Sequence, residues 1–136
     1  MKFLDTYRPQ IFAAGRIVFG LLFAMHGLQK VFGMFGGPPA ELPAVAAYVI
    51  GGIELVGGAL VAVGFKTRLA AFIVSGQMAV AYFAVHQKEG LLPIQNHGEL
   101  AVLYCWAFLM IAAVDKWTWA LDAGPDPESQ AAQAAE

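Results

Sequence analysis

The sequence contains little charge for its length. Of its 136 residues, 13% are charged and 59% are hydrophobic, whereas soluble domains are about a quarter charged. Such a composition is typical of integral membrane proteins, and the lipid bilayer is therefore the first partner expected. The net charge of −2 and the lack of a basic patch argue against a nucleic-acid partner.

Cysteine is also scarce, since Cys105 is the single one. It cannot form an internal disulfide or a cysteine-based metal site, and its thiol is interpreted as a core filler. No phosphate loop, dinucleotide fingerprint or nucleophile–base motif is present. Two histidines from separate spans could ligate haem or a metal, but no metal-binding spacing supports this, and no metal is expected.

Four apolar segments occupy most of the chain, at about 11–33, 43–64, 67–86 and 99–117. Each approaches the roughly 20 residues that a bilayer-crossing helix needs. Arg16 and His26 inside the first segment argue against a cleaved signal peptide. We therefore predict an all-α membrane protein, an antiparallel four-transmembrane-helix bundle, with residues 1–121 as one membrane domain.

Basic residues predict the orientation, because they concentrate in short cytoplasmic loops. Five fall on one side of the predicted bundle, and only Lys88 lies clearly on the other: Lys2, Arg8, Lys66, Arg68 and Lys116. Both termini are therefore expected to be cytoplasmic. Residues 122–136 are small, acidic and proline-containing, which predicts a disordered acidic cytoplasmic tail.

The first span carries charge and glycine on one helical stripe, with His26 beside it: Arg16, Gly20, Phe23, Gly27 and Lys30. A charge at the centre of a membrane helix costs at least about 2.5 kcal/mol, so this face should point into the protein. Glycines let a second helix backbone approach closely. The second span repeats the pattern around Glu54, which is the predicted ion-pair partner of Lys30.

Depth along the predicted helices brings several polar residues together in the outer half of the bundle, as candidates for ligand binding or proton relay: His26, Lys30, Glu54, Tyr82, His86, Asn96 and Glu99. The alternative for Lys30 and Glu54 is a structural pair that fixes helix register. His26 could be satisfied by a backbone carbonyl. Asn96 and Glu99 have the form of a helix N-terminal cap.

Two further residues are assigned from the same patterns. Arg16 is a structural charge within the span, which could snorkel to the cytoplasmic interface. Gln77 lies off the stripe that Ser75, Tyr82 and His86 share on the third span, and it is expected to point elsewhere.

Three blocks of the sequence resemble the DoxX family of small bacterial membrane proteins. The first is Arg16-Ile-x-x-Gly20-x-x-Phe23-x-x-His26-Gly27-x-x-Lys30. The second is Gly51-x-x-Glu54-x-x-Gly57-Gly58-x-Leu60-x-x-x-Gly64-x-x-Thr67-Arg68-x-Ala70-Ala71. The third is Asn96-x-Gly98-Glu99-x-Ala101-x-x-Tyr104. The resemblance covers about residues 11–120 and implies a multi-pass protein of the bacterial inner membrane.

The family is named for a subunit of a thiosulfate:quinone oxidoreductase, so the resemblance implies quinone-linked redox chemistry. The first hypothesis is an oxidoreductase subunit that binds a quinone in the outer-half pocket and works with membrane, periplasmic or cytoplasmic redox partners. The alternative is a non-enzymatic scaffold or assembly subunit of a redox or stress-response complex. A transporter is disfavoured by the small size and the lack of an internal repeat, unless the chain forms a homo-oligomer.

Overall fold

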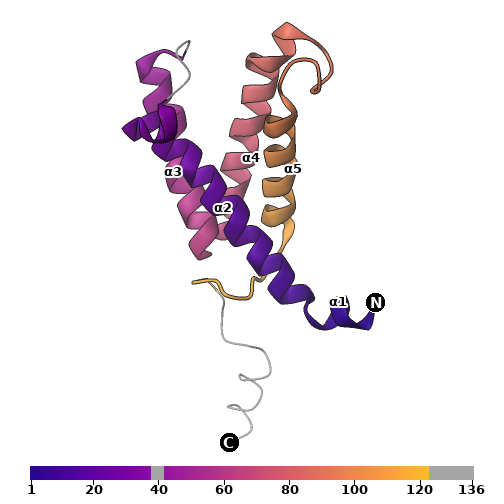
Figure 1. Cartoon of the computed structure of the whole chain (residues 1–136). Helices are drawn as coiled ribbons and strands as arrows, with labels where there is room; N and C mark the ends of the chain where they lie inside the picture. Colours follow the sequence, from indigo (N-terminus) through magenta and orange to yellow (C-terminus); the bar gives the residue numbers. More distant parts are fainter. Residues whose placement is uncertain (38–41, 123–136) are drawn as a thin grey trace, which may run out of the picture.

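The computed structural model describes residues 1–37 and 42–122, and every regular element in these two ranges is helical. Four helices form the body of the molecule (Figure 1): α2 (Arg8–Phe32), α3 (Ala44–Val63), α4 (Thr67–Ala84) and α5 (Glu99–Ala113). Three short elements flank them: α1 (Lys2–Thr6), η1 (Met34–Gly36) and η2 (His86–Glu89). The predicted all-α class is confirmed. Of the predicted tail, only Asp122 lies within the described residues.

Three of the helical segments are long and apolar enough to cross a membrane: Arg8–Phe32, Ala44–Val63 and Thr67–Glu89. The first begins three residues before its predicted start, because Pro9 occupies its first turn, where a missing N–H costs nothing. Gly33 and Gly64 end α2 and α3 with φ of 68° and 75°. Glycine adopts this left-handed conformation without a steric penalty.

The helix α5 is shorter than the fourth predicted span of 99–117, because it ends at Ala113. Its 15 residues rise about 22 Å, against roughly 30 Å for a hydrocarbon core. Val114 is extended, and the chain beyond it turns across the bundle end. There Asp115 bonds Arg68 at 2.5 Å, and Trp117 is buried. These tertiary contacts, which the apolar run does not reveal, end the helix early.

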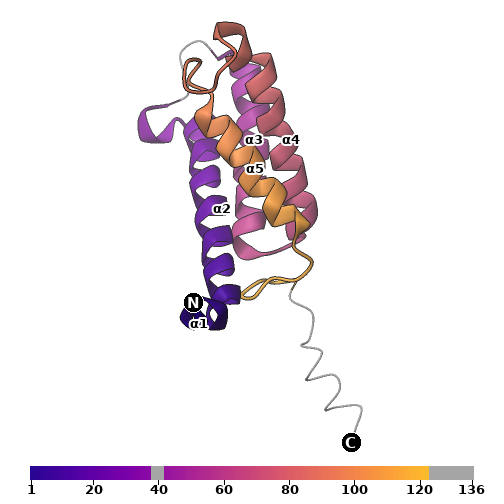
Figure 2. The same cartoon turned by 90° about the vertical axis from the view of Figure 1, so that its right-hand side faces the viewer.

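The helices pack antiparallel in chain order. Arg68 and Ser75 of α4 bond the backbone of Ala112 and Cys105 of α5, so residue numbers rise on one helix as they fall on the other. Figures 1 and 2 show α2 crossing α3, and α4 running beside α5. The N-terminus and the segment 114–122 lie at the same end of the bundle in both views.

Glycines set the crossing of α2 on α3, as the sequence predicts. A Cβ added to Gly20 would lie 2.7 Å from the carbonyl oxygen of Gly58, and one added to Gly27 would lie 2.6 Å from that of Gly51. Real Cβ atoms do not approach backbone this closely. The two helices are therefore in backbone contact, which places the side chains one turn further along α2 directly against α3.

Apolar side chains fill the core and also cover the outside. Phe23, Val74 and Phe108 are at most 1% exposed. Large apolar residues also face outward on all four long helices, among them Leu21, Val56, Phe72 and Leu103. Soluble proteins rarely expose extended apolar surface, whereas lipid accepts it. Together with the span-length helices, this surface identifies a multi-pass membrane protein.

Candidate functional site

The centre of the site is the ion pair that the sequence predicts. Lys30 Nζ of α2 lies 2.7 Å from Glu54 Oε2 of α3. The side chains are 14% and 4% exposed, so both charges are removed from the surroundings. The close crossing of the helices produces this geometry, because a Cβ on Gly51 would lie 2.7 Å from the Cβ of Lys30. The prediction that Glu54 is the partner of Lys30 is confirmed.

Gln77 of α4 extends this pair. As the sequence predicts, it points elsewhere than Ser75, which bonds Cys105 O of α5; the structure shows that Gln77 faces α3. Its Nε2 lies 3.4 Å from both Glu54 Oε1 and the carbonyl oxygen of Ile50. Its Oε1 is buried, and among the described residues it has no hydrogen-bond partner. The sequence signal for this contact was a polar amide within an apolar span. Helical phase showed that Gln77 faces away from Ser75 and Tyr82, but it could not show which helix Gln77 meets.

His26 and Tyr104 lie beside the ion pair. The half-buried His26 ring meets the Tyr104 ring edge to face, with centroids 5.9 Å apart. Tyr104 of α5 is 7% exposed and stacks on Phe108. Neither the imidazole nor the phenol forms a side-chain hydrogen bond within residues 1–37 and 42–122. Tyr104 belongs to the third family-like block, yet sequence reasoning did not select it, because its proximity to His26 exists only in three dimensions.

Tyr82, His86 and Asn96, which the sequence grouped with this site, form a separate cluster that holds the loop between η2 and α5. The Tyr82 hydroxyl donates to Leu91 O at 2.9 Å, and His86 Nδ1 lies 3.0 Å from Asn96 O. Asn96 is fully buried, and its Nδ2 donates to Gly90 O at 2.7 Å. These side chains already form hydrogen bonds with backbone carbonyl groups, so they stabilise the loop rather than contribute to the Lys30 site.

The N-terminal cap of α5 is not the predicted one. Gly98, rather than Asn96, occupies the cap position, and the Asn96 Oδ1 accepts from Gly98 N at 2.8 Å. The carboxamide is held on its other side by Gly90, so it cannot reach the first turn of the helix. Glu99 is the exposed first residue of α5, with a carboxylate at the positive end of the helix.

Arg16 lies elsewhere in the bundle and does not snorkel. It is 1% exposed, and Nη1 donates to the carbonyls of Val61 and Ala62 at the end of α3. Its Nη2 donates to Trp119 O at 2.6 Å. The snorkelling interpretation is therefore wrong, because the last carbonyls of α3 give the guanidinium a buried anchor. Its assignment as a structural charge fits these contacts.

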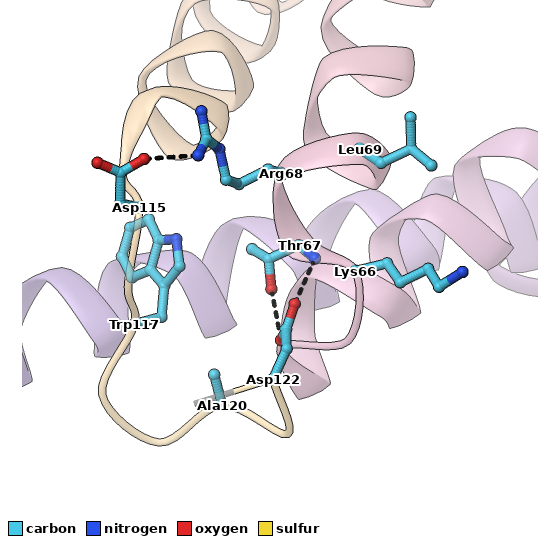
Figure 3. A pocket seen from close by; sticks show the side chains of 8 residues that line it. All are labelled: Lys66, Thr67, Arg68, Leu69, Asp115, Trp117, Ala120 and Asp122. Carbon is cyan, nitrogen blue, oxygen red and sulfur yellow. Dashed lines mark hydrogen bonds and ion pairs between the residues drawn. The ribbon is translucent and has the colours of Figure 1, made fainter. Parts of the chain in front are cut away.

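Two cavities are described, and both lie toward the Arg16 end of the bundle. One, of about 250 Å³, lies beneath the segment 114–122 (Figure 3), where the Asp122 carboxylate accepts from Thr67 N and Oγ1. The other, of about 200 Å³, lies between α2 and α5. Neither is lined by His26, Lys30 or Glu54.

The polar cluster around Lys30 can bind and orient an oxygen-bearing molecule. It presents a cation, a carboxylate, an imidazole, a phenol and an amide from four different helices within an apolar bundle. Lys30 and Glu54 balance in charge, and the other three groups keep hydrogen-bonding capacity. Within the part of the chain that the structure describes, no group of three or more His, Cys, Asp or Glu residues could hold a metal ion.

Comparisons with known proteins are consistent with the membrane fold. The sequence model of the DoxX family matches residues 11–87. An uncharacterized protein of Haemophilus influenzae is 40% identical over 129 residues, covering 90% of this chain and 96% of that protein. A Bacillus subtilis protein named "Putative oxidoreductase CatD" is 32% identical over 111 residues, covering 79% and 81% of the two chains. No solved structure matches the chain significantly.

Proposed function

The chain belongs to the DoxX family of membrane proteins, and we propose that it is an oxidoreductase subunit that binds a lipid-soluble quinone beside Lys30 and Glu54. The observation that carries the proposal is the gathering of polar groups from α2, α3, α4 and α5 around one buried ion pair. Ionisable residues inside membrane spans are costly and usually mark a function. The name of the Bacillus subtilis relative supports the redox part of the proposal.

The residues present fit such a ligand. A quinone has two carbonyl oxygens that accept hydrogen bonds, and the Tyr104 hydroxyl and His26 ring are available as donors. Gln77 Oε1, which has no hydrogen-bond partner in residues 1–37 and 42–122, is an acceptor suited to the hydroxyl of the reduced form. When bound, the quinone would supply two-electron, two-proton redox chemistry. The fit therefore extends to both oxidation states.

Each side chain would have a distinct part in this chemistry. Lys30 places positive charge near the oxygen that gains electron density, which is how preorganised donors favour such a change. Glu54 balances that charge when no ligand is bound. His26, one turn from Lys30, can donate a ring N–H hydrogen bond to a ligand oxygen. Tyr104 orients the ring system by its hydroxyl.

We further propose that α5 completes a fourth crossing with its flanking residues, and that both termini face the cytoplasm of the bacterial inner membrane. Basic residues support this orientation. Arg8 is the first residue of α2, which begins at the bundle end that carries the segment 114–122, and Lys66 and Arg68 lie beside that segment. The Lys30 cluster then lies in the outer half. Electrons would be exchanged with a membrane-associated or soluble redox protein, and a second copy of the chain is a further possible neighbour.

A scaffold function is the second candidate. It is favoured by one observation, namely that neither described cavity reaches the Lys30–Glu54 pair. On this hypothesis the pair only joins α2 to α3. The double variant Lys30→Met/Glu54→Leu would then retain the partner proteins that co-purify with the wild-type chain, because apolar replacements can substitute for a structural ion pair.

The binding proposal is tested with the full-length protein in detergent and decylubiquinone as the probe. Binding is followed by quenching of tryptophan fluorescence. His26→Ala and Tyr104→Phe should each weaken binding by about tenfold, the effect of removing a hydrogen bond in an apolar site. Glu54→Gln should also weaken binding, because Lys30 loses the carboxylate that holds its ammonium group in place. Tyr48→Phe, at a residue 61% exposed on α3, is the matched control and should bind like wild type.

Expression level and gel-filtration profile must be unchanged for a variant to be counted. Wild-type affinity in both His26→Ala and Glu54→Gln would overturn the quinone site. Retention of partners by the double variant, combined with no quinone binding by the wild type, would establish the scaffold function instead.

A further inference from the structure

A second ligand site is indicated by two orphaned donors at the opposite end of the bundle. Arg16 is 1% exposed and Trp117 is 8% exposed. Arg16 Nε and Trp117 Nε1 are both buried, and neither has a hydrogen-bond partner within the described residues. Buried N–H groups without partners are rare because each costs free energy. The two side chains are in contact, with the guanidinium carbon 5.7 Å from the Trp117 ring. One bound acceptor could therefore satisfy both N–H groups.

Both side chains line the same groove between α2 and α5. It has a volume of about 200 Å³, and its other walls are almost entirely apolar, including Ile11, Phe19 and Met110. Gly15 also lines it, and a Cβ added there would meet nothing within 4 Å. The groove is therefore apolar and open at Gly15, and two of its lining side chains carry the buried donors Arg16 Nε and Trp117 Nε1.

Charge defines the ligand further. No carboxylate of residues 1–37 or 42–122 lies within ion-pair distance of Arg16, whose described partners are three backbone carbonyls. Asp122 acts on Arg16 electrostatically from beyond that distance, but its carboxylate is bonded to Thr67. A buried cation without a directly paired counter-charge is unfavourable. A water molecule or a neutral carbonyl would satisfy the donors but would not supply that pair. The site therefore favours an anionic oxygen.

Depth and size identify the kind of molecule. Arg16 lies at the level of the last carbonyls of α3, and the groove reaches Val114, just past the end of α5, so its donors are near the membrane–water interface. The cavity is smaller than the about 300–1,000 Å³ of sites for drug-sized ligands. It suits part of one acyl chain, with a headgroup at the interface.

We propose that this groove binds an anionic phospholipid, with a phosphate oxygen accepting from Arg16 Nε and Trp117 Nε1 and one acyl chain lying between α2 and α5. Such a lipid would join α2 to the short helix α5 at the bundle end, beyond the aromatic contacts of Phe19 and Phe23 with Tyr104. This site is separate from the Lys30 cluster and does not depend on the proposed quinone binding.

The test uses native mass spectrometry of the full-length protein in neutral detergent, titrated with palmitoyl-oleoyl phosphatidylglycerol or with the corresponding phosphatidylcholine. Wild type should retain phosphatidylglycerol in clear preference to phosphatidylcholine. Gly15→Leu should fill the groove and reduce phosphatidylglycerol binding by about tenfold, comparable with the loss of one charged hydrogen bond. Gly76→Leu, at an exposed glycine that also has open space, is the matched control and should bind like wild type.

Trp117→Phe removes one donor but keeps an aromatic ring, and it should weaken phosphatidylglycerol binding without altering the gel-filtration profile. The proposal is overturned by equal binding of the two lipids, by wild-type binding in Gly15→Leu, or by the absence of any lipid adduct. A competition experiment could also overturn the proposal. If decylubiquinone displaced phosphatidylglycerol from wild type but not from Gly15→Leu, the groove would be a site for an uncharged ligand and not for an anionic lipid.

Discussion

At Lys30 and Glu54, opposite charges meet at 2.7 Å while exposing 14% and 4% of their side chains. Desolvation of two charges costs several kcal/mol, and their attraction roughly offsets it. The pair therefore adds little net stability, yet neither member can be removed alone without leaving a buried charge. Single and double substitutions at these two positions should therefore have very different effects on stability.

Lys30→Met should lower the unfolding free energy by about 3–5 kcal/mol, because it leaves Glu54 charged, buried and unpaired. Lys30→Met/Glu54→Leu should recover most of that loss, since two apolar side chains pack where the pair stood. Thermal unfolding of the purified protein in detergent measures both. A double variant no more stable than the single one would show that the lost stability does not come from the unpaired carboxylate.

Arg16 differs from Lys30 because its partners are backbone carbonyls rather than a carboxylate. Arg16→Met should destabilise by at least about 2 kcal/mol, since a hydrogen bond to a charged group is worth about 1.5–3 kcal/mol and several would be lost. Arg8→Met is the matched control, because Arg8 forms an exposed pair with Asp5, and such pairs contribute about 0–1 kcal/mol. Equal shifts in melting temperature would contradict the buried anchor at Arg16.

At the scale of helices, the crossing of α2 on α3 fixes where every polar group of the site lies. Gly20 and Gly27 each rest on α3 backbone, with Gly58 and Gly51 as the facing glycines. A methyl group at such a contact has no flexible neighbour to displace. Two helices must separate to accept it, and the ion pair beyond the contact must lengthen.

Gly27→Ala should therefore destabilise by about 1–3 kcal/mol, the usual cost of overpacking, even though alanine favours helix by up to about 1 kcal/mol. Gly76→Ala, where a Cβ meets nothing within 4 Å, should be neutral or stabilising. Melting temperatures in detergent give the comparison. A Gly27→Ala protein as stable as wild type would mean that α2 and α3 are further apart than described.

The start of α4 depends on a residue from the other end of the chain. Lys66 occupies the cap position with φ of 48° and offers no acceptor. The Asp122 carboxylate supplies one, accepting from Thr67 N at 3.0 Å and from Thr67 Oγ1 at 3.2 Å (Figure 3). The segment 114–122 is thereby fastened across the end of the bundle.

Asp122→Ala should cost about 1 kcal/mol, the usual value of a lost helix cap, and should speed amide exchange in the first turn of α4. Asp122→Asn keeps one carboxamide oxygen and should retain most of the protection. Asp115→Ala breaks an exposed pair with Arg68 instead and should leave this exchange unchanged. Hydrogen–deuterium exchange mass spectrometry measures all three, and unaltered exchange in Asp122→Ala would contradict the cap.

At the scale of the whole molecule, two ends of different character enclose an apolar body. One end carries Lys66 and Arg68 beside the segment 114–122 (Figure 3). The other carries η2 and the loop held by Tyr82, His86 and Asn96. The proposed orientation follows from this distribution of basic residues, and it decides which side of the membrane the Lys30 cluster approaches.

Cysteine labelling of intact bacterial cells tests the orientation. In a Cys105→Ala background, Lys88→Cys should react with a membrane-impermeant maleimide, whereas Lys66→Cys should react only after the inner membrane is opened, because basic loops remain cytoplasmic. Both positions are exposed, so access alone separates them. The reverse pattern would invert the molecule and place the polar cluster in the inner half.

Several features could be predicted from residue order alone. The apolar runs gave the all-helical membrane fold, the glycine stripes gave the close crossing of α2 and α3, and the charges within the spans required the pairing of Lys30 with Glu54. Each follows from a local pattern joined to one strong constraint, the cost of unpaired charge in an apolar medium.

Other features depended on where distant segments meet. The structure adds Gln77 and Tyr104 to the predicted site and places three of its predicted members in a separate cluster: Tyr82, His86 and Asn96. Helix rotation and the path of the loop decide which side chains face each other, and neither can be read from residue order. Arg16 joins the end of α3 to the chain beyond α5, which folds back over it. The sequence by itself determined that charges had to be buried in pairs or anchored. Only the tertiary structure decided with which groups, since partner choice is a property of packing between helices and not of periodicity within them.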